Sequence, residues 1–405
     1  MGAQGVYAGL RILELGAGAA GPVASRYFAE HGATVLRIES STRPDFLRML
    51  HAKPGEPVDV DAAPIFALLN PDKWSVALDL EKPAARALAL RLVDWADVVT
   101  QHFAPGAMET LGLGAEQLLA RKPGLIVVTS SLFGHTDPHC HDPRLGGQGA
   151  AIAGFHHLTG WPDREALGPY ATITDSLSPR YVALLIAAAL LERSRGGAGQ
   201  HIDVSQIETG VYSLSEFVVR YSANGESVVR AGNREAGAAP HGVYPCAGED
   251  AWIAIEVASD GEWQALVAAM GAPSWAREPR FATAAGRVAH QHDLDARLAA
   301  WTRETGAYLL MAQLQEAGVP AGVVQHLNQL LQDPQLAHRR HFVPLDHAVL
   351  GVLPYERSGF RLSASPGGFD DSGPLLGEDN DTVLGEILGL SAAEIEQLLV
   401  DDVIA

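Results

Sequence analysis

Strands and helices alternate along the first half of the chain, and this alternation constrains the fold more than any other feature of the sequence. Residues Leu10 to Leu15 have the apolar run of a buried strand, a helical pattern follows, and Ala33 to Ile38 form a second apolar run. The alternation continues through a helical pattern at 82–95 and a strand pattern at 123–130. Because helices that connect parallel strands cross over a face of the sheet, the pattern over residues 8–205 predicts an α/β domain with a doubly wound, mainly parallel sheet.

The pattern changes after about residue 226. A Gly- and Ala-rich stretch precedes a predicted strand at Ala251 to Val257, and helical patterns follow. A chain of 405 residues is too long for one simple core, so a second domain is expected. We predict a large domain that includes residues 1–210, and a smaller α+β middle domain formed by residues 226–322.

The charge balance restricts the partners of the chain. With 48 acidic and 29 basic residues the formal net charge is −19, which argues against nucleic acid and against an anionic membrane surface as partners. The longest apolar stretch, Tyr181 to Leu191, is shorter than the roughly 20 residues that a membrane span needs. The N-terminus has no signal-peptide pattern, and Cys140 and Cys246 cannot build a disulfide framework, so we expect a cytoplasmic protein.

The first turn between a predicted strand and a predicted helix contains three glycines. The stretch Gly16-Ala-Gly18-Ala-Ala-Gly21 reads as G-x-G-x-x-G, and Glu39 follows about twenty residues later. This pattern is typical of a loop that binds the pyrophosphate of a dinucleotide. An NAD(P)-dependent oxidoreductase that uses the Gly16–Gly21 loop is therefore one alternative function.

A carboxylate stands at the start of the longest apolar segment. Asp175 precedes Ser178 and Pro179, and proline is well tolerated in the first turn of a helix, so we predict that the helix begins there. The positive end of the helix dipole would keep the Asp175 carboxylate ionised and oriented. These are properties that a nucleophile needs.

The segment around Asp175 resembles the core signature of a known enzyme family. Asp175, the apolar helix, Gly196-Gly-Ala-Gly-Gln200 and a short strand follow one another as in the class III CoA-transferases, the family of formyl-CoA transferase and carnitine CoA-transferase. The stretch from Gly168 to Arg180 is similar to the benzylsuccinyl-CoA transferase branch. Further family landmarks occur in order along the chain, at Ala20-Gly21-Pro22, Lys73-Trp-Ser-Val-Ala-Leu-Asp79, Ala96-Asp97-Val98 and Pro105-Gly106.

The resemblance covers essentially the whole chain and implies an acyl-CoA:carboxylate CoA-transferase. Such an enzyme moves CoA between an acyl-CoA donor and a carboxylic acid acceptor through a covalent aspartyl intermediate, which Asp175 would carry. CoA is then a substrate, and no tightly bound cofactor is expected. The family also implies that residues 330–405 return to the large domain, so that both chain ends form it, and that two chains make an interlocked dimer. A homodimer is expected here, and a heteromer with a paralogous subunit stays open.

Further residues are candidate contacts of the substrates. The resemblance and the basic residues of the first hundred positions place the CoA contacts at Ala19, Arg37, Ser40, Lys73, His102 and Phe103. Each acyl addition creates an oxyanion, which needs backbone N–H donors, and small residues let the backbone approach closely. The candidates for the oxyanion and substrate contacts are Gly146, Gly147, Gly237 and Ala238.

The chain departs from the family at several of these positions. His102 stands where the family has an asparagine, Ala19 where formyl-CoA transferases have a glutamine, and residues 236–239 replace a run of glycines. Formyl or oxalyl specificity is therefore not expected. We expect an acid that is larger or less polar than oxalate, with a dicarboxylate as acceptor and succinyl-CoA as donor as one option.

Two other interpretations stay open. The α-methylacyl-CoA racemases share the fold and use a His–Asp pair, which His141-Asp142 resembles, although that pair lies several residues too early. A non-catalytic subunit would keep the fold, but the retention of Asp175 argues against it. The run from His135 to Asp142 contains metal-ligand residue types, but adjacent residues of one loop rarely build a tetrahedral site alone, so we predict a polar loop and no metal.

Overall fold

The computed structural model describes residues 5–53, 57–136, 138–141, 146–169 and 172–404, which form two compact units. The first unit takes in Met1–His156, Gly168–Ser227 and His338–Ala405, and the second takes in His157–Leu167 and Val228–Ala337. The second unit thus includes residues 157–167, which the sequence-based division places in the large domain.

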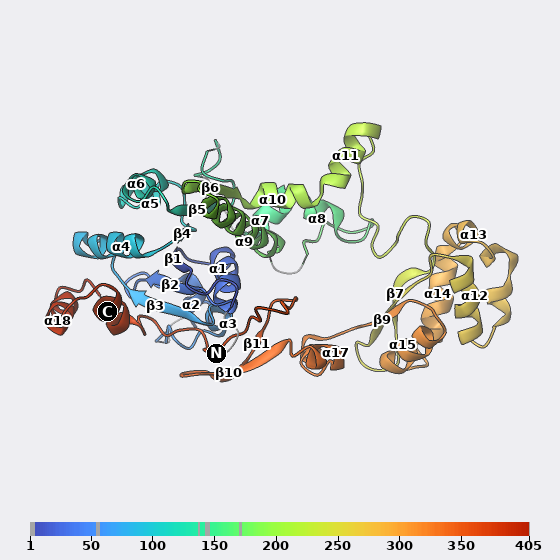
Figure 1. Ribbon diagram of the computed structural model, residues 1–405. Coiled ribbons are helices and arrows are strands. Elements are labelled where there is room, and N and C mark those ends of the chain that lie inside the picture. The colour runs from blue at the N-terminus through green and yellow to red at the C-terminus, as the bar shows by residue number, and fades with distance from the viewer. Residues whose placement is uncertain (1–4, 54–56, 137, 142–145, 170–171, 405) are drawn as a thin grey trace. The chain divides into compact units, whose positions relative to one another are not determined.

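A six-stranded parallel sheet forms the centre of the first unit (Figure 1). Neighbouring strands run in the order β3-β2-β1-β4-β5-β6, so the strand order reverses between β1 and β4. The central strands are buried on both faces, in keeping with their nearly continuous apolar sequences. The predicted doubly wound α/β fold is confirmed. The strands are β1 (Arg11–Leu15), β2 (Thr34–Glu39), β3 (Lys73–Ala77), β4 (Val98–Gln101), β5 (Ile126–Ser131) and β6 (Gln200–Ser205).

Helices cover both faces of this sheet. α1 and α9 pack on one face, and α4, α6 and the C-terminal segment pack on the other (Figure 1). Successive strand residues enter opposite cores, as Ile12 and Leu13 do, because side chains alternate along a strand. These helices are α1 (Ala20–Glu30), α4 (Pro83–Trp95), α6 (Ala115–Arg121), α9 (Ile173–Ser194) and α18 (Ala392–Val400).

The C-terminal segment is part of the first unit. The backbone N–H of Asp79 donates to the carbonyl of Val403 at 3.0 Å, and Leu78 forms a β-bridge with Ile404. Ser391 and Glu394 form the capping box that the sequence predicts at the start of α18.

The start of α9 differs from the prediction. The helix begins at Ile173, with Thr172 as its N-cap, so Asp175 lies in the first turn and Pro179 lies inside the helix. A buried stripe runs along α9 from Thr174 to Ala189 and outweighs the one hydrogen bond that proline removes. Among the described helices, α9 is long and apolar enough to cross a membrane by length and composition, and here it packs on α1 and β5.

Shorter elements complete the first unit. They are a β-hairpin and several short helices. These elements are α2 (Phe46–Met49), α3 (Pro64–Leu69), α5 (Ala107–Thr110), α7 (Gly146–Ile152), α8 (Phe155–Leu158), α10 (Gln206–Ser213), α11 (Ser215–Asn224), β10 (Phe342–His347) and β11 (Gly351–Glu356).

The second unit combines a three-stranded antiparallel sheet, in the order β7-β8-β9, with helices around a core of its own. Trp263, Ile253 and Leu298 are buried in that core. The strands are β7 (His241–Pro245), β8 (Trp252–Glu256) and β9 (Ala321–Val324), and the helices are α12 (Asp260–Ala269), α13 (Ala284–Ala289), α14 (Gln291–Thr302), α15 (Ala307–Glu316) and α16 (Leu327–Leu330). α17 (Pro334–His338) lies where the chain passes from the second unit to the first.

Candidate active site

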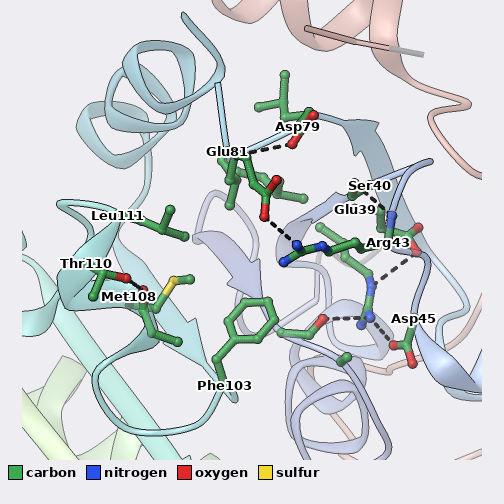
Figure 2. Close-up of a pocket in the computed structure, with 17 residues that line it drawn as sticks. Glu39, Ser40, Arg43, Asp45, Asp79, Glu81, Phe103, Met108, Thr110 and Leu111 are labelled. Carbon is green, nitrogen blue, oxygen red and sulfur yellow. Dashed lines mark hydrogen bonds and ion pairs between the residues drawn. The ribbon is translucent and has the colours of Figure 1, made fainter. Parts of the chain in front are cut away.

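The loops that follow β1, β2, β3 and β4 line a pocket of about 350 Å³ (Figure 2). The pocket lies where the strand order reverses, which is where open α/β sheets bind their ligands. Figure 2 shows Phe103, Met108 and Leu111 on one side of the pocket and Arg43 reaching toward Glu81 on the other. The pocket thus combines an apolar wall with a charged one.

The predicted CoA contacts divide into two groups in this structure. Arg37, Ser40 and Phe103 line the pocket. Ala19 is the N-cap of α1, while Lys73 and His102 pack behind the lining residues.

Arg37 and Lys73 are engaged by acids of their own unit. The Arg37 guanidinium pairs with Glu14 and Asp45 and donates to the carbonyl of Gly16 at 2.9 Å. The Nζ atom of Lys73 lies 3.0 Å from Oε2 of Glu14, with both side chains fully buried. Removing one partner from such a buried pair would leave an uncompensated charge. These cations therefore stabilise the buried acids that lie beneath the pocket.

This network sets the pKa values of its members. Burial by itself would raise the pKa of Glu14, but Lys73, Arg37 and the Ser25 hydroxyl hold it down at about 2. Burial lowers the pKa of Lys73 to about 8, against the opposing attraction of Glu14. Glu14 is therefore ionised at neutral pH and depends on its cationic neighbours.

The glycine-rich loop is filled by side chains of the protein. The Gly18 N–H donates to both carboxylate oxygens of Asp45 at 3.1 Å, so a protein carboxylate takes the place where a dinucleotide loop would hold a phosphate. A Cβ at Gly21 would overlap the ring of His102, and a Cβ at Gly16 would lie 2.8 Å from Cβ of His102. The glycines therefore make room for His102.

The acid that completes the dinucleotide pattern is also engaged. Both carboxylate oxygens of Glu39 accept hydrogen bonds from Arg48 at 2.9 Å, and one also accepts from the Ser75 hydroxyl at 2.8 Å. A ribose ligand would have to compete with these bonds. The geometry therefore does not favour the oxidoreductase alternative.

His102 is electrically neutral at physiological pH, because burial lowers its pKa to about 4. Its two ring nitrogens are shielded from solvent, and neither finds a partner of normal hydrogen-bond geometry among the described residues.

Asp175 lies elsewhere on the same edge of the sheet, in the first turn of α9. Its carboxylate rests against the backbone of Gly146, since a Cβ at Gly146 would overlap the carboxylate oxygens. The Thr174 hydroxyl donates to the Gly146 carbonyl at 3.1 Å and fixes this approach. Burial raises the pKa of Asp175, although hydrogen bonds from Thr172 and Gln206 act in the opposite direction. The helix dipole alone predicts a readily ionised Asp175 carboxylate, and burial acts against that ionisation.

Gln206 is a site residue that the sequence reasoning missed. It is buried and follows β6 directly, and a polar residue directly after a buried parallel strand is the signal that could have identified it. β6, which Gln206 follows, lies two strands away from β4 in the sheet order.

The remaining predicted substrate contacts belong to both units. Gly146 is the one of them that the structure places against Asp175, while the position of a Cβ at Gly147 is open. Gly237 and Ala238 belong to the second unit, where Gly237 has a φ of +85° and Ala238 is buried.

The loop with metal-ligand residue types is partly described. Asp137 and Asp142 lie outside the described residues, and among the described ones no group of three His, Cys, Asp or Glu side chains is placed to hold a metal ion. The backbone N–H of His135 donates to the carboxylate of Asp203 at 2.9 Å, and burial lowers the pKa of the His135 imidazole.

The fold and the site together define an α/β enzyme. They combine a doubly wound sheet, a pocket where its strand order reverses, and a half-buried carboxylate on the same edge. The chain belongs to CoA-transferase family III, whose family model matches residues 7–380.

Known proteins resemble the chain over nearly its full length. Succinyl-CoA–D-citramalate CoA-transferase of Chloroflexus aurantiacus is 36% identical over 392 residues, which are 96% of either chain. Succinate–glutarate CoA-transferase of Agrobacterium fabrum is 29% identical and covers 94% of this chain and 95% of its own. The crystal structure of a CAIB/BAIF family protein from Brucella suis matches with a TM-score of 0.87 at 30% identity, over 95% of this chain and all of the other.

The chain is therefore an enzyme that transfers CoA between an acyl-CoA and a carboxylic acid. The predicted family and activity are confirmed. The racemase and oxidoreductase alternatives find no support in these relatives.

Proposed function

We propose that this CoA-transferase works through a covalent intermediate on Asp175. The setting of the carboxylate carries the proposal, because it is half-buried, rests on Gly146 and has the uncharged hydrogen-bond partners Thr172 and Gln206. Burial raises the pKa of Asp175 and so makes the ionised carboxylate more basic than one in water. A basic, oriented carboxylate is suited to attack a thioester.

The transfer then consists of carbonyl additions and eliminations. An oxygen of Asp175 attacks the carbonyl carbon of the donor thioester. The C–S bond breaks, the CoA thiolate is released, and Asp175 and the donor acyl group form a mixed anhydride. The thiolate attacks the Asp175 carbonyl carbon, which releases the donor acid as a carboxylate and leaves an aspartyl-CoA thioester. The acceptor carboxylate attacks this thioester, the C–S bond breaks to release the CoA thiolate, and a second anhydride forms. The thiolate then attacks the acceptor carbonyl of this anhydride, which gives the CoA thioester of the acceptor and frees the Asp175 carboxylate.

The pocket after β1 to β4 is the proposed place for the nucleotide end of CoA. Phe103, Met108 and Leu111 offer an apolar wall for a base. The Arg43 side chain is 76% exposed and pairs with Glu81 at 2.6 Å, and such exposed pairs contribute only about 0–1 kcal/mol. Arg43 can therefore exchange this partner for a phosphate at little cost. Arg37 and Lys73 act indirectly in this account, by holding the buried acids.

The proposed acceptor is a dicarboxylic acid. The relatives described above are named for citramalate, succinate and glutarate, which are dicarboxylates, and this supports the expectation of an acid larger than oxalate. Incubation with succinyl-CoA and a panel of mono- and dicarboxylic acids, with the product thioesters identified by mass, tests it. Turnover of monocarboxylates alone would contradict it.

We further propose a cytoplasmic homodimer. Exposed apolar side chains gather along α9, α10 and α11, which is unfavourable for an isolated chain. Light scattering should give twice the chain mass, and a monomer at micromolar concentration would contradict the proposal. The side chains concerned are Leu184, Tyr212, Val218, Val219 and Tyr221, each at least 54% exposed.

Replacement of the nucleophile tests the mechanism. Asp175→Asn should lower the transfer rate by about 10⁴-fold or more, because an amide cannot form the anhydride. Glu208→Gln is a matched control, since Glu208 is also a first-turn acid but is exposed, and it should keep full activity. Substantial transfer by a correctly folded Asp175→Asn variant would contradict the covalent mechanism.

A further inference from the structure

A cluster of arginines lies far along the chain from the acyl-transfer site. The hairpin of β10 and β11 is antiparallel, with Phe342 opposite Glu356, and the backbone N–H of Arg357 donates to the carbonyl of His341 at 2.8 Å. The residues before β10 therefore lie beside the residues after β11. This pairing gathers the arginine cluster, which consists of Arg339, Arg340, Arg357 and Arg361.

The arginine cluster surrounds a hollow in the surface. Arg340, Arg357 and Arg361 line a space of about 190 Å³, together with Leu362, Pro366 and Gly367. None of the described residues that line this hollow is acidic. A second, smaller hollow is lined by Arg339 together with the other three arginines of the cluster.

The charge of the cluster is largely uncompensated. Glu30 lies 3.7 Å from Arg357, but it is buried and also accepts hydrogen bonds from Ser358 at 3.0 Å and 2.5 Å. In the part of the chain that the structure describes, no ion pair is formed by Arg339, Arg340 or Arg361. Other exposed arginines of this acidic chain do pair with carboxylates, as in Arg43–Glu81, Arg121–Asp94 and Arg220–Glu226.

The segment that carries the cluster is anchored in place. Phe360 stacks on His31, with ring centroids 5.3 Å apart, and packs on Tyr27 at 5.6 Å, so it is fixed to the C-terminal end of α1. Arg340 has a φ of +49°, a left-handed backbone conformation that is unfavourable for a residue with a side chain. The pocket after β1 adjoins the other end of α1, which lies about 16 Å away along a helix of this length.

We propose that the arginine cluster is a second binding site, specific for a phosphate-type oxyanion. Guanidinium groups bind phosphate through pairs of charge-assisted hydrogen bonds, and three of them around one hollow repel one another until an anion is bound. The anion is either free phosphate or pyrophosphate, or a phosphate of a CoA molecule. The site does not depend on the covalent mechanism at Asp175.

Isothermal titration of the full-length enzyme tests the proposal. The probes are pyrophosphate, adenosine 3′,5′-bisphosphate, which carries CoA-like phosphates, and succinate as a carboxylate control. The test variant is Arg340→Gln/Arg361→Gln, and the control Arg195→Gln/Arg303→Gln removes two exposed arginines elsewhere with the same change in net charge. Circular dichroism establishes that both variants are folded.

We expect pyrophosphate to bind the wild type. The test variant should bind it at least about tenfold more weakly, because each hydrogen bond between an arginine and the charged ligand contributes strongly to the binding free energy. The control variant should bind as the wild type does. If adenosine 3′,5′-bisphosphate shows the same dependence and the KM for acyl-CoA rises in parallel, the phosphates are those of CoA. If transfer kinetics are unchanged, the anion is a separate ligand.

Three results would overturn the proposal. If pyrophosphate does not bind the wild type, or if it binds both variants equally, the cluster is not an anion site. Arginine-dependent binding of succinate but not of pyrophosphate shows that it serves carboxylates. A lower molar mass of the test variant by light scattering, with pyrophosphate binding unchanged, shows that the arginines contact a second chain.

Discussion

Glu14 and Asp175 are carboxylates of the same unit, near the same sheet, and they are built in opposite ways. Glu14 is fully buried against Lys73, Arg37 and Ser25, and these partners hold its pKa at about 2. Asp175 is half-buried with uncharged partners, and burial raises its pKa. The comparison shows that full ionic pairing makes a carboxylate a structural element, whereas burial with few partners leaves it basic and available for chemistry.

The largest effect on stability is expected from the structural side of the comparison. Lys73→Met should lower the free energy of unfolding by about 3 kcal/mol, because it leaves the buried Glu14 carboxylate with fewer partners. Urea denaturation at neutral pH measures this change. Adding Glu14→Gln to the same chain should restore part of the loss, and additive effects of the two substitutions would show that the pair is not coupled.

Gly146→Ala should act on the proposed nucleophile, the Asp175 carboxylate, with little effect on folding. The added methyl group would overlap the Asp175 carboxylate and displace it, so transfer should fall by about 100-fold. Gly147→Ala is the matched control, since its Cβ position is open, and it should keep near-normal activity. Equal rates for the two variants would mean that contact with Gly146 does not position Asp175.

Gln206→Leu should shift the pH dependence of catalysis. The Gln206 hydrogen bond lowers the pKa of Asp175, so its loss raises that pKa further. In the proposed mechanism the ionised carboxylate is the nucleophile, and therefore the acidic limb of kcat/KM should move to higher pH, with a loss of about tenfold at its acidic end and a smaller loss at pH 8. An unchanged pH profile with uniformly lower activity would indicate a purely structural role for Gln206.

The smallest effect on stability is expected at the exposed edge of the pocket. Arg43→Gln should change the free energy of unfolding by less than about 1 kcal/mol, because its pair with Glu81 is exposed. It should raise the KM for acyl-CoA a few-fold, whereas Glu81→Gln should lower it or leave it unchanged, since it frees Arg43. Steady-state kinetics separate these outcomes, and equal shifts in both variants would argue against phosphate contact.

The fold could be predicted from the sequence because its signals are local. The apolar runs of β1 and β2 and the capping box at Ser391 depend on neighbours a few residues apart. The start of α9 was misplaced because a local preference of Pro179 was outweighed by burial of the whole helix face.

The site was less predictable because its contacts are distant in sequence. Arg37 pairs with Glu14, 23 positions away, and Lys73 pairs with the same acid from 59 positions away, so their basic side chains read as candidate ligands. Gln206 reaches Asp175 because strand order brings β6 beside α9, which no spacing along the chain reveals. Asp175 itself is predicted as the acyl carrier from the family signature around it, and that role stays a prediction.

The covalent role of Asp175 is tested most directly by trapping the intermediate. Enzyme incubated with acyl-CoA and no acceptor is treated with hydroxylamine or borohydride, digested, and analysed by mass spectrometry. We predict that the peptide containing Asp175 gains the mass of the hydroxamate or becomes the corresponding alcohol, and that no other acidic peptide changes. An unmodified Asp175 peptide from enzyme that is turning over would contradict the account.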